Sequence, residues 1–237
     1  MSASFKFKQF SVIQDRCAMK IGTDGVLLGA WVTVENNPES ILDIGAGTGV
    51  ISLQLAQRSL APTIDAVEID NDAYEQCSEN FEASPWGDRL FCYHASIQEF
   101  ASEIDEKYDL IVSNPPFYTA EYKSENPSRD LARFEDALPF RHLIICVAHL
   151  LSENGVFAVV LPKNEADNFI ALTSENKLFL KRICNVKGTP NSEIKRVLLE
   201  FSFHQKALIE ELLTIENTRH NYTREYIELV KDFYIKM

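Results

Sequence analysis

The chain has 237 residues, of which 46% are hydrophobic and 24% charged, and its formal net charge is −12. This composition excludes disordered and fibrous proteins, and no apolar run approaches the roughly 18 residues that would cross a membrane. The five cysteines form no C-x-x-C pair, which disfavours a disulfide framework or a zinc site. We expect a cytoplasmic protein without a metal, folded as a single domain over residues 1–237 with residues 1–37 as an N-terminal leading segment.

Short β-rich runs alternate with helical stretches along the chain. The predicted strands cover residues 41–44, 63–69, 90–94, 109–113, 155–161, 179–186 and 197–203. The predicted helices cover residues 48–58, 71–83, 138–151, 166–174 and 223–234. This alternation is typical of an α/β fold in which a wound sheet carries helices on both faces.

A glycine-rich turn with the sequence Asp43-Ile-Gly45-Ala-Gly47-Thr-Gly49 follows the first of these strands. Glycines allow a tight turn and let a ligand lie against the backbone. The turn differs from a dinucleotide fingerprint because Val50 stands where that motif requires glycine. A carboxylate at Asp43 would repel a pyrophosphate and attract an ammonium or sulfonium group. The turn therefore favours S-adenosylmethionine over NAD as cofactor.

An acidic residue, Glu68, ends the second predicted strand, 19 positions after Gly49. An acid near this spacing accepts hydrogen bonds from ribose hydroxyls. The nearby Asp70 lies beyond the strand end, where we expect it to cap the next helix. We therefore predict that Glu68 binds the cofactor ribose.

The turn Asn114-Pro115-Pro116-Phe117 follows the fourth predicted strand. The Asn114 side-chain oxygen and the Pro115 carbonyl can accept hydrogen bonds from a planar amine and direct its lone pair. The two prolines hold this backbone extended, and the Phe117 ring offers a face on which an extruded base stacks. These four residues are our predicted catalytic group. The alternative is that the two prolines only end a strand.

Basic residues gather in two parts of this acidic chain, although its isoelectric point of about 4.9 is unusual for a nucleic-acid-binding protein. Residues 1–20 hold four bases against one acid, and residues 177–206 hold seven against two. Lys181 and Arg182 of the second window are predicted RNA contacts, and two ordinary solvated faces are the alternative. Residues 118–140 include Arg129 and Arg133 and are predicted to be a substrate loop, or else a surface insertion.

The glycine turn and the Asn114–Phe117 turn together resemble the class I S-adenosylmethionine-dependent methyltransferases that carry an N-P-P-[FY] motif. The resemblance implies a Rossmann-like, seven-stranded, mostly parallel sheet whose last strand is antiparallel. Enzymes of this group methylate the exocyclic amine of adenine or guanine, or the glutamine amide of release factors. Residues 9–31, 129–133, 222–226 and 232–237 are similar to the tRNA1(Val) (adenine(37)-N6)-methyltransferase family.

That family resemblance implies that the substrate is the adenine beside the anticodon of a valine tRNA. We also expect a monomer. The resemblance places Thr23 and Asp24 near the methionine part of the cofactor, although Asp24 could instead cap the helix from residue 25 to 31. Ser96 stands where the family usually has an acid that binds the cofactor adenine. The alternatives are a protein-glutamine methyltransferase, an rRNA guanine-N2 methyltransferase and a non-catalytic cofactor-binding module.

Overall fold

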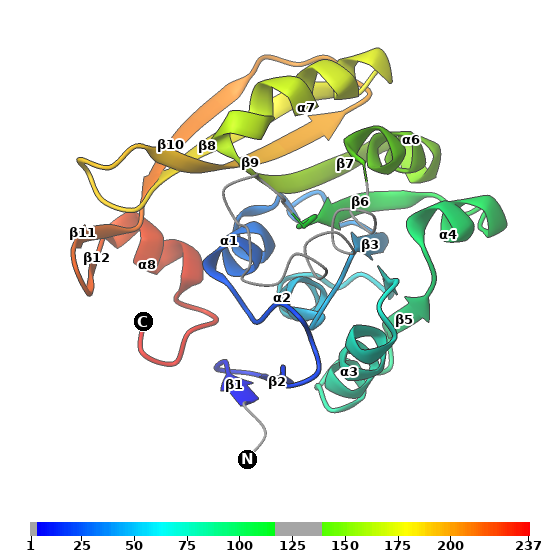
Figure 1. Cartoon of the computed structure of the whole chain (residues 1–237), viewed down its shortest axis with the longest axis horizontal. Helices are drawn as coiled ribbons and strands as arrows, with labels where there is room; N and C mark the ends of the chain where they lie inside the picture. Colours follow the sequence, from blue (N-terminus) through cyan, green and yellow to red (C-terminus); the bar gives the residue numbers. More distant parts are fainter. Residues whose placement is uncertain (1–3, 117–138) are drawn as a thin grey trace, which may run out of the picture.

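A computed structural model describes residues 4–116 and 139–237 of the chain. Its central sheet has the strand order β10-β8-β9-β7-β6-β3-β4-β5 (Figure 1). The strands are β3 (Ser40–Ile44), β4 (Thr63–Glu68), β5 (Leu90–His94), β6 (Tyr108–Ser113), β7 (Leu151–Pro162), β8 (Phe179–Lys187), β9 (Ile194–Ser202) and β10 (Ile209–Thr214). Only β9 among them runs antiparallel to its neighbours. The predicted α/β sheet is confirmed.

The expected seven strands are joined by an eighth, β10, which pairs in parallel with β8 at the edge of the sheet. Its sequence, Ile-Glu-Glu-Leu-Leu-Thr, lacks the continuous apolar character of a strand buried on both faces. Leu212 in this strand is 62% exposed. An edge strand has only one neighbour, so its sequence carries a weak signal, and this explains why the pattern of apolar residues did not reveal it.

Helices cover both faces of the sheet, as predicted. They are α1 (Thr23–Trp31), α2 (Val50–Arg58), α3 (Asn71–Glu82), α4 (Ile97–Glu103), α6 (Phe140–Leu150), α7 (Lys163–Glu175) and α8 (Arg224–Val230). Alternate strand residues point to opposite faces, so Leu110 and Val112 of β6 pack with α1 and α2, whereas Ile111 between them packs with α4 and α6. Each face thus has its own hydrophobic core.

The order in which the chain adds strands to the sheet reverses between β3 and β6, which are parallel neighbours. From β3 the chain proceeds to β4 and β5 on one side, and from β6 it proceeds to β7 on the other. Ile44 and Ser113 are register partners, and the Ser113 hydroxyl donates to the Ile44 carbonyl at 2.9 Å. Ligands of α/β proteins bind at such a reversal, outside the carboxyl ends of the strands. The glycine turn and the Asn114 turn both begin there.

The two ends of the described chain meet on the α3 and α8 side of the molecule (Figure 1). Strands β1 (Ser4–Lys6) and β2 (Ser11–Ile13) form a small hairpin, and Phe7 in the connection between them forms a bridge with Tyr234. The Lys8 amide donates to the Phe233 carbonyl at 2.8 Å. A second hairpin, β11 (Glu216–Thr218) and β12 (Asn221–Tyr222), precedes α8. Among the helices of the described residues, we find none that meets the length and apolarity of a membrane span.

Candidate functional site

The glycine turn at the end of β3 combines a left-handed backbone conformation with open space. Gly45, Gly47 and Gly49 have φ values of +73°, +55° and +76°, in the left-handed region that favours glycine. A Cβ atom at Gly45 or Gly47 would meet nothing within 4 Å. A Cβ at Gly49 would lie 2.5 Å from a Phe81 ring carbon. The first two glycines therefore line an open cradle, and the third allows α2 to pack closely against α3.

Asp43 lies beneath this cradle and is fully buried. Its Oδ2 atom accepts hydrogen bonds from the Ser52 hydroxyl at 2.7 Å and the Ser52 amide at 3.2 Å, while Oδ1 has no partner among the described residues. Desolvation raises the pKa of Asp43 from 3.8 to about 6. Asp43 thus anchors the first turn of α2, and the structure does not place it on the open surface of the cradle.

Glu68 shapes the glycine turn directly. Its two carboxylate oxygens accept hydrogen bonds from the Gly47 amide at 2.8 Å and the Asp70 amide at 2.9 Å. A carboxylate has about four acceptor positions, so both oxygens retain capacity for a ligand. The predicted cap is confirmed, since the Asp70 side chain accepts from the Ala73 amide at 2.8 Å. Glu68 therefore links the ends of β3 and β4 around the cradle.

Asn114 and Pro115 follow β6 directly and stand beside the beginning of α1. Asn114 is half-buried and Pro115 is buried, whereas Pro116 is exposed. A Cβ atom built on Gly25 would lie 3.8 Å from the Asn114 Nδ2 atom and 3.5 Å from Val50 at the start of α2. Three segments thus converge at this point. The other predicted members of the site, Phe117, Arg129 and Arg133, lie outside the described residues.

The beginning of α1 holds Thr23 and Asp24, and Thr23 is exposed. Asp24 does not cap the helix: the capping residue is Gly22, and no side chain accepts from the first turn. Instead the Asp24 Oδ2 atom pairs with the Arg196 Nε atom of β9 at 2.7 Å. The alternative reading of Asp24 as a helix cap is therefore wrong. Sequence reasoning also missed its partner, because Arg196 is 172 positions away.

Close packing fixes α1 along its length. The Gln54 Nε2 atom of α2 donates to the Val26 carbonyl at 3.1 Å. A Cβ atom at Gly29 would lie 2.4 Å from the Gln54 Oε1 atom, so a larger residue there would force the Gln54 side chain to shift. Arg58 donates to the Gly29 and Val32 carbonyls at 2.8 and 2.9 Å. The glycine spacing in α1 therefore positions Thr23 and Asp24 relative to the cradle.

Ser96 forms a capping box at the start of α4. Its hydroxyl donates to the Glu99 carboxylate at 2.8 Å, and the Glu99 amide lies 3.2 Å from the same hydroxyl. The Ser96 amide also donates to the Glu99 carboxylate, at 3.0 Å. The bonds that this carboxylate accepts, from the Ser96 amide first and the Ser96 hydroxyl second, lower the pKa of Glu99. Sequence reasoning missed Glu99, although the S-x-x-E spacing is a helix-start signal. The Glu99 carboxylate is thus hydrogen-bonded to Ser96, at the position where the family usually has an acid.

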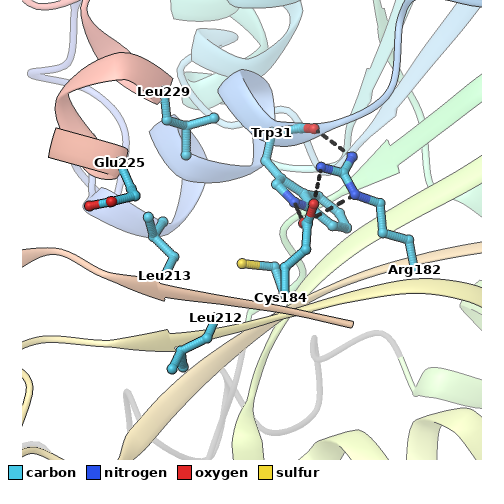
Figure 2. A pocket seen from close by; sticks show the side chains of 8 residues that line it. Trp31, Arg182, Cys184, Leu212, Leu213, Glu225 and Leu229 are labelled. Carbon is cyan, nitrogen blue, oxygen red and sulfur yellow. Dashed lines mark hydrogen bonds and ion pairs between the residues drawn. The ribbon is translucent and has the colours of Figure 1, made fainter. Parts of the chain in front are cut away.

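Lys181 and Arg182 form ion pairs within the sheet. Lys181 lies 3.6 Å and Arg182 lies 3.7 Å from the carboxylate of Glu200, which is fully buried. Arg182 also donates to both Glu211 oxygens, at 3.0 and 3.1 Å, and stacks over the Trp31 ring at 4.2 Å. Arg182 and Trp31 line a cavity of about 300 Å³, and Figure 2 shows the two side chains beside each other there. The structure thus does not bring Lys181 or Arg182 to Asn114.

Comparison with known proteins gives the family. The model of the methyltransferase small domain matches residues 22–164. A protein of Flavobacterium johnsoniae with the name tRNA1(Val) (adenine(37)-N6)-methyltransferase is 60% identical over 98% of this chain and 100% of its own. The chain belongs to this methyltransferase family. A relative with the same name in Pseudoalteromonas translucida is 43% identical over 99% of this chain and 100% of its own.

Solved structures share the fold of this methyltransferase. A predicted O-methyltransferase of Agrobacterium tumefaciens superposes with a TM-score of 0.69 at 17% identity, over 89% of this chain and 96% of its own. A putative RNA methyltransferase of Pyrococcus horikoshii gives a TM-score of 0.51 at 19% identity, over 75% and 80%. Membership of the family confirms S-adenosylmethionine as the cofactor. The absence of a metal stays a prediction.

Proposed function

We propose that the chain transfers a methyl group from S-adenosylmethionine to the N6 amine of adenine 37 in tRNA1(Val). The observation that carries the proposal is the position of Asn114. It follows β6 at the reversal point of the sheet, where the glycine turn after β3 also begins. The hydrogen-bond acceptor that we propose for the adenine amine and the open cradle therefore follow the ends of two neighbouring strands, which supports a shared site.

The described residues fit the cofactor. Gly45 and Gly47 leave open space against the backbone, and Glu68 beside them can accept from hydroxyl groups. The buried Asp43 carries its charge beneath the same turn and favours a cationic ligand through its field rather than by contact. When bound, the cofactor supplies a methyl group attached to a positively charged sulfur. The binding roles of these residues are part of our proposal.

The chain's own contribution to the reaction is to bind and aim the adenine amine. The lone pair of this amine is delocalised into the ring, so the nitrogen is a poor nucleophile. Two acceptors, the Asn114 Oδ1 atom and the Pro115 carbonyl, would hold its two N–H groups and direct the lone pair toward the methyl carbon. The prolines limit the motion of both acceptors, because they restrict the backbone dihedrals on either side. Positioning and oriented dipoles therefore carry the catalysis.

This mechanism needs no histidine or cysteine as a general base. The bound cofactor would supply the methyl group and keep the electron pair of the cleaved bond on sulfur, so Asn114 and Pro115 would only have to hold the attacking nitrogen in line. One N–H proton is then lost to water while the Asn114 and Pro115 acceptors still hold the nitrogen. We also propose that the enzyme works as a monomer, without a metal, in the cytoplasm.

The decisive experiment follows a labelled methyl group into defined acceptors. The anticodon stem-loop of tRNA1(Val) is expected to be methylated, and nucleoside analysis is expected to yield N6-methyladenosine. The same stem-loop with guanine at position 37 is the matched control and should remain unlabelled. Labelling of a release factor, or of a guanine amine, would contradict the proposed substrate. Cofactor binding without any methyl transfer would contradict the proposed catalysis.

A further inference from the structure

The basic window at residues 177–206 lies on β8 and β9, and the register of these strands divides it between opposite edges of the sheet. We use carboxyl edge for the side at which β3, β6 and β7 end, and amino edge for the other side. Strand β9 is antiparallel to both β7 and β8. Strand β8 therefore runs in the same direction as β7, toward the carboxyl edge, and β9 runs back. The turn between them therefore lies on the same edge as Asn114.

Both outer parts of the window lie toward the amino edge. Lys177 precedes β8, and Lys206 follows β9, where Ser202 is the register partner of Phe179. Lys181 and Arg182 lie in the first half of β8, and the register puts Arg182 level with Val112 of β6. Glu200 pairs with both cations and Glu211 pairs with Arg182. Because these acids already engage them, we do not retain the two residues as RNA contacts.

The middle of the window lies at the carboxyl edge. Lys187 ends β8, while Lys195 and Arg196 begin β9. Arg196 is the register partner of Pro162, the last residue of β7, and Lys163 follows it. Lys195 is exposed, and Lys163 and Lys187 are partly exposed. These three lysines form no ion pair with another described residue. We name Lys163, Lys187, Lys195 and Arg196 the edge cations.

The turn that joins the two strands is an ordered platform between Lys187 and Lys195. The Ser192 hydroxyl donates to the Thr189 carbonyl at 2.9 Å, and the Ser192 amide donates to the same carbonyl at 3.0 Å. The turn contains one acidic residue, Glu193, and Arg196 after it is paired with Asp24. The lysines flank a turn whose shape is set before a ligand arrives, so binding there orders few additional groups.

The separation from Asn114 suits a nucleic-acid backbone. Neighbouring strands are about 4.8 Å apart, so β9 and β8 lie roughly 10 and 14 Å from β6 across the sheet. The register also carries Arg196, the partner of Pro162, about 10 Å past the level of Ser113, the partner of Val159. Stacked nucleotides advance about 3.4 Å along a strand, so the combined separation corresponds to roughly four to five nucleotides. Lysine ammonium groups are point charges that bind phosphate oxygens. We infer that the edge cations bind the phosphate backbone of the RNA that flanks the target adenine; this inference rests on the proposed function.

A charge-matched pair of double variants tests the inference. Lys187→Glu with Lys195→Glu removes two edge cations, and Lys177→Glu with Lys206→Glu makes the same change at the amino edge. Each pair lowers the net charge by four, from −12 to −16, so long-range repulsion is matched. We expect the first pair to weaken binding of the tRNA1(Val) stem-loop tenfold or more at low salt, and the second pair to weaken it less than threefold.

The salt dependence separates phosphate contacts from a general charge effect. Loss of two phosphate contacts should reduce the slope of log affinity against log salt by about 1.4, at about 0.7 per single-strand phosphate. The neutral pair Lys187→Gln with Lys195→Gln should show the same slope change with a smaller loss of affinity. Cofactor binding, measured by calorimetry, reports that the folded site is intact in each variant.

The outcomes also distinguish this inference from the proposed function. Equal losses in the two charge-reversed pairs, or an unchanged salt slope in the Lys187 and Lys195 variants, would overturn RNA docking at the edge cations. Methyl transfer to the stem-loop by the unmodified chain would still stand in that case. If the unmodified chain binds the cofactor but methylates no RNA, the proposed function fails, whatever the variants bind.

Discussion

The ion-pair cluster in the middle of β8 and the carboxyl edge of the sheet differ in how they use charge and space. In the cluster, Arg182, Glu200 and Glu211 pair with one another, and the Trp31 ring covers the guanidinium. At the carboxyl edge, Gly45 and Gly47 face open space, and Lys187 and Lys195 pair with no described residue. The cluster therefore holds the sheet and α1 together, whereas the carboxyl edge is open to ligands. Variants in the two regions should accordingly affect different measurements.

The largest effect is expected from Asn114→Ala at the carboxyl edge. This change removes one of the two acceptors that orient the amine, so turnover should fall about 10²–10³-fold, as for loss of one oriented donor in an oxyanion site. Cofactor affinity should stay within a few fold, because the glycine turn is untouched. Single-turnover methylation with saturating cofactor and RNA provides the measurement. A near-normal rate would disprove the orientation mechanism.

A pair of glycine variants should separate stability from cofactor binding. Gly49→Ala adds an atom 2.5 Å from Phe81 at φ +76°, so strain and overpacking together should cost about 3 kcal/mol of unfolding free energy. Gly47→Ala meets no neighbouring atom and should cost only about 1 kcal/mol of strain while weakening cofactor binding more than tenfold. Denaturant unfolding and calorimetric titration check the two effects. Equal destabilisation by both would contradict the assignment of an open cradle.

In the ion-pair cluster of β8, Arg182→Gln should destabilise the fold without changing RNA contacts. The substitution leaves Glu200 and Glu211 without their guanidinium partner, and we expect a loss of about 2 kcal/mol. The salt slope of RNA binding should remain that of the unmodified chain at a temperature where both proteins are folded. Thermal unfolding and binding at several salt concentrations test this. A reduced slope would show that Arg182 contacts the RNA after all.

The smallest effect concerns the pH dependence of cofactor binding through Asp43. Its pKa is raised to about 6 by burial, so the protonated form prevails below that value. A cationic ligand favours the ionised form, and affinity should therefore rise a few fold as pH increases through about 6. In the free protein the same shift lowers stability as pH rises from 3.8 to about 6, because the unfolded state loses its proton first. Calorimetry at pH 5.5 and 7.5 measures the effect, and Asp43→Asn should abolish it.

The sequence sufficed for features that depend on local patterns. The apolar run of β6, the glycine turn and the Asp70 cap each depend on neighbouring residues, and all three are found as predicted. It did not suffice where strand pairing decides the outcome. Basic composition marked residues 177–206, but only the register shows that Lys187 and Lys195 lie at the carboxyl edge, and only the ion pairs show that acids already engage Arg182. The partner of Asp24 was hidden for the same reason.

The contacts between residues 7–8 and 231–234 have a consequence for biosynthesis. Lys8 binds the carbonyl of Lys231, which is 223 positions later in the chain. The hairpin that contains Lys8 is joined to the site through Asn80, which holds the carbonyls of Ile13 and Thr48. On the ribosome, this hairpin lacks its closing partner until residue 231 has emerged. The order of synthesis therefore delays completion of the cradle's outer support until nearly every other part of the sheet is in place.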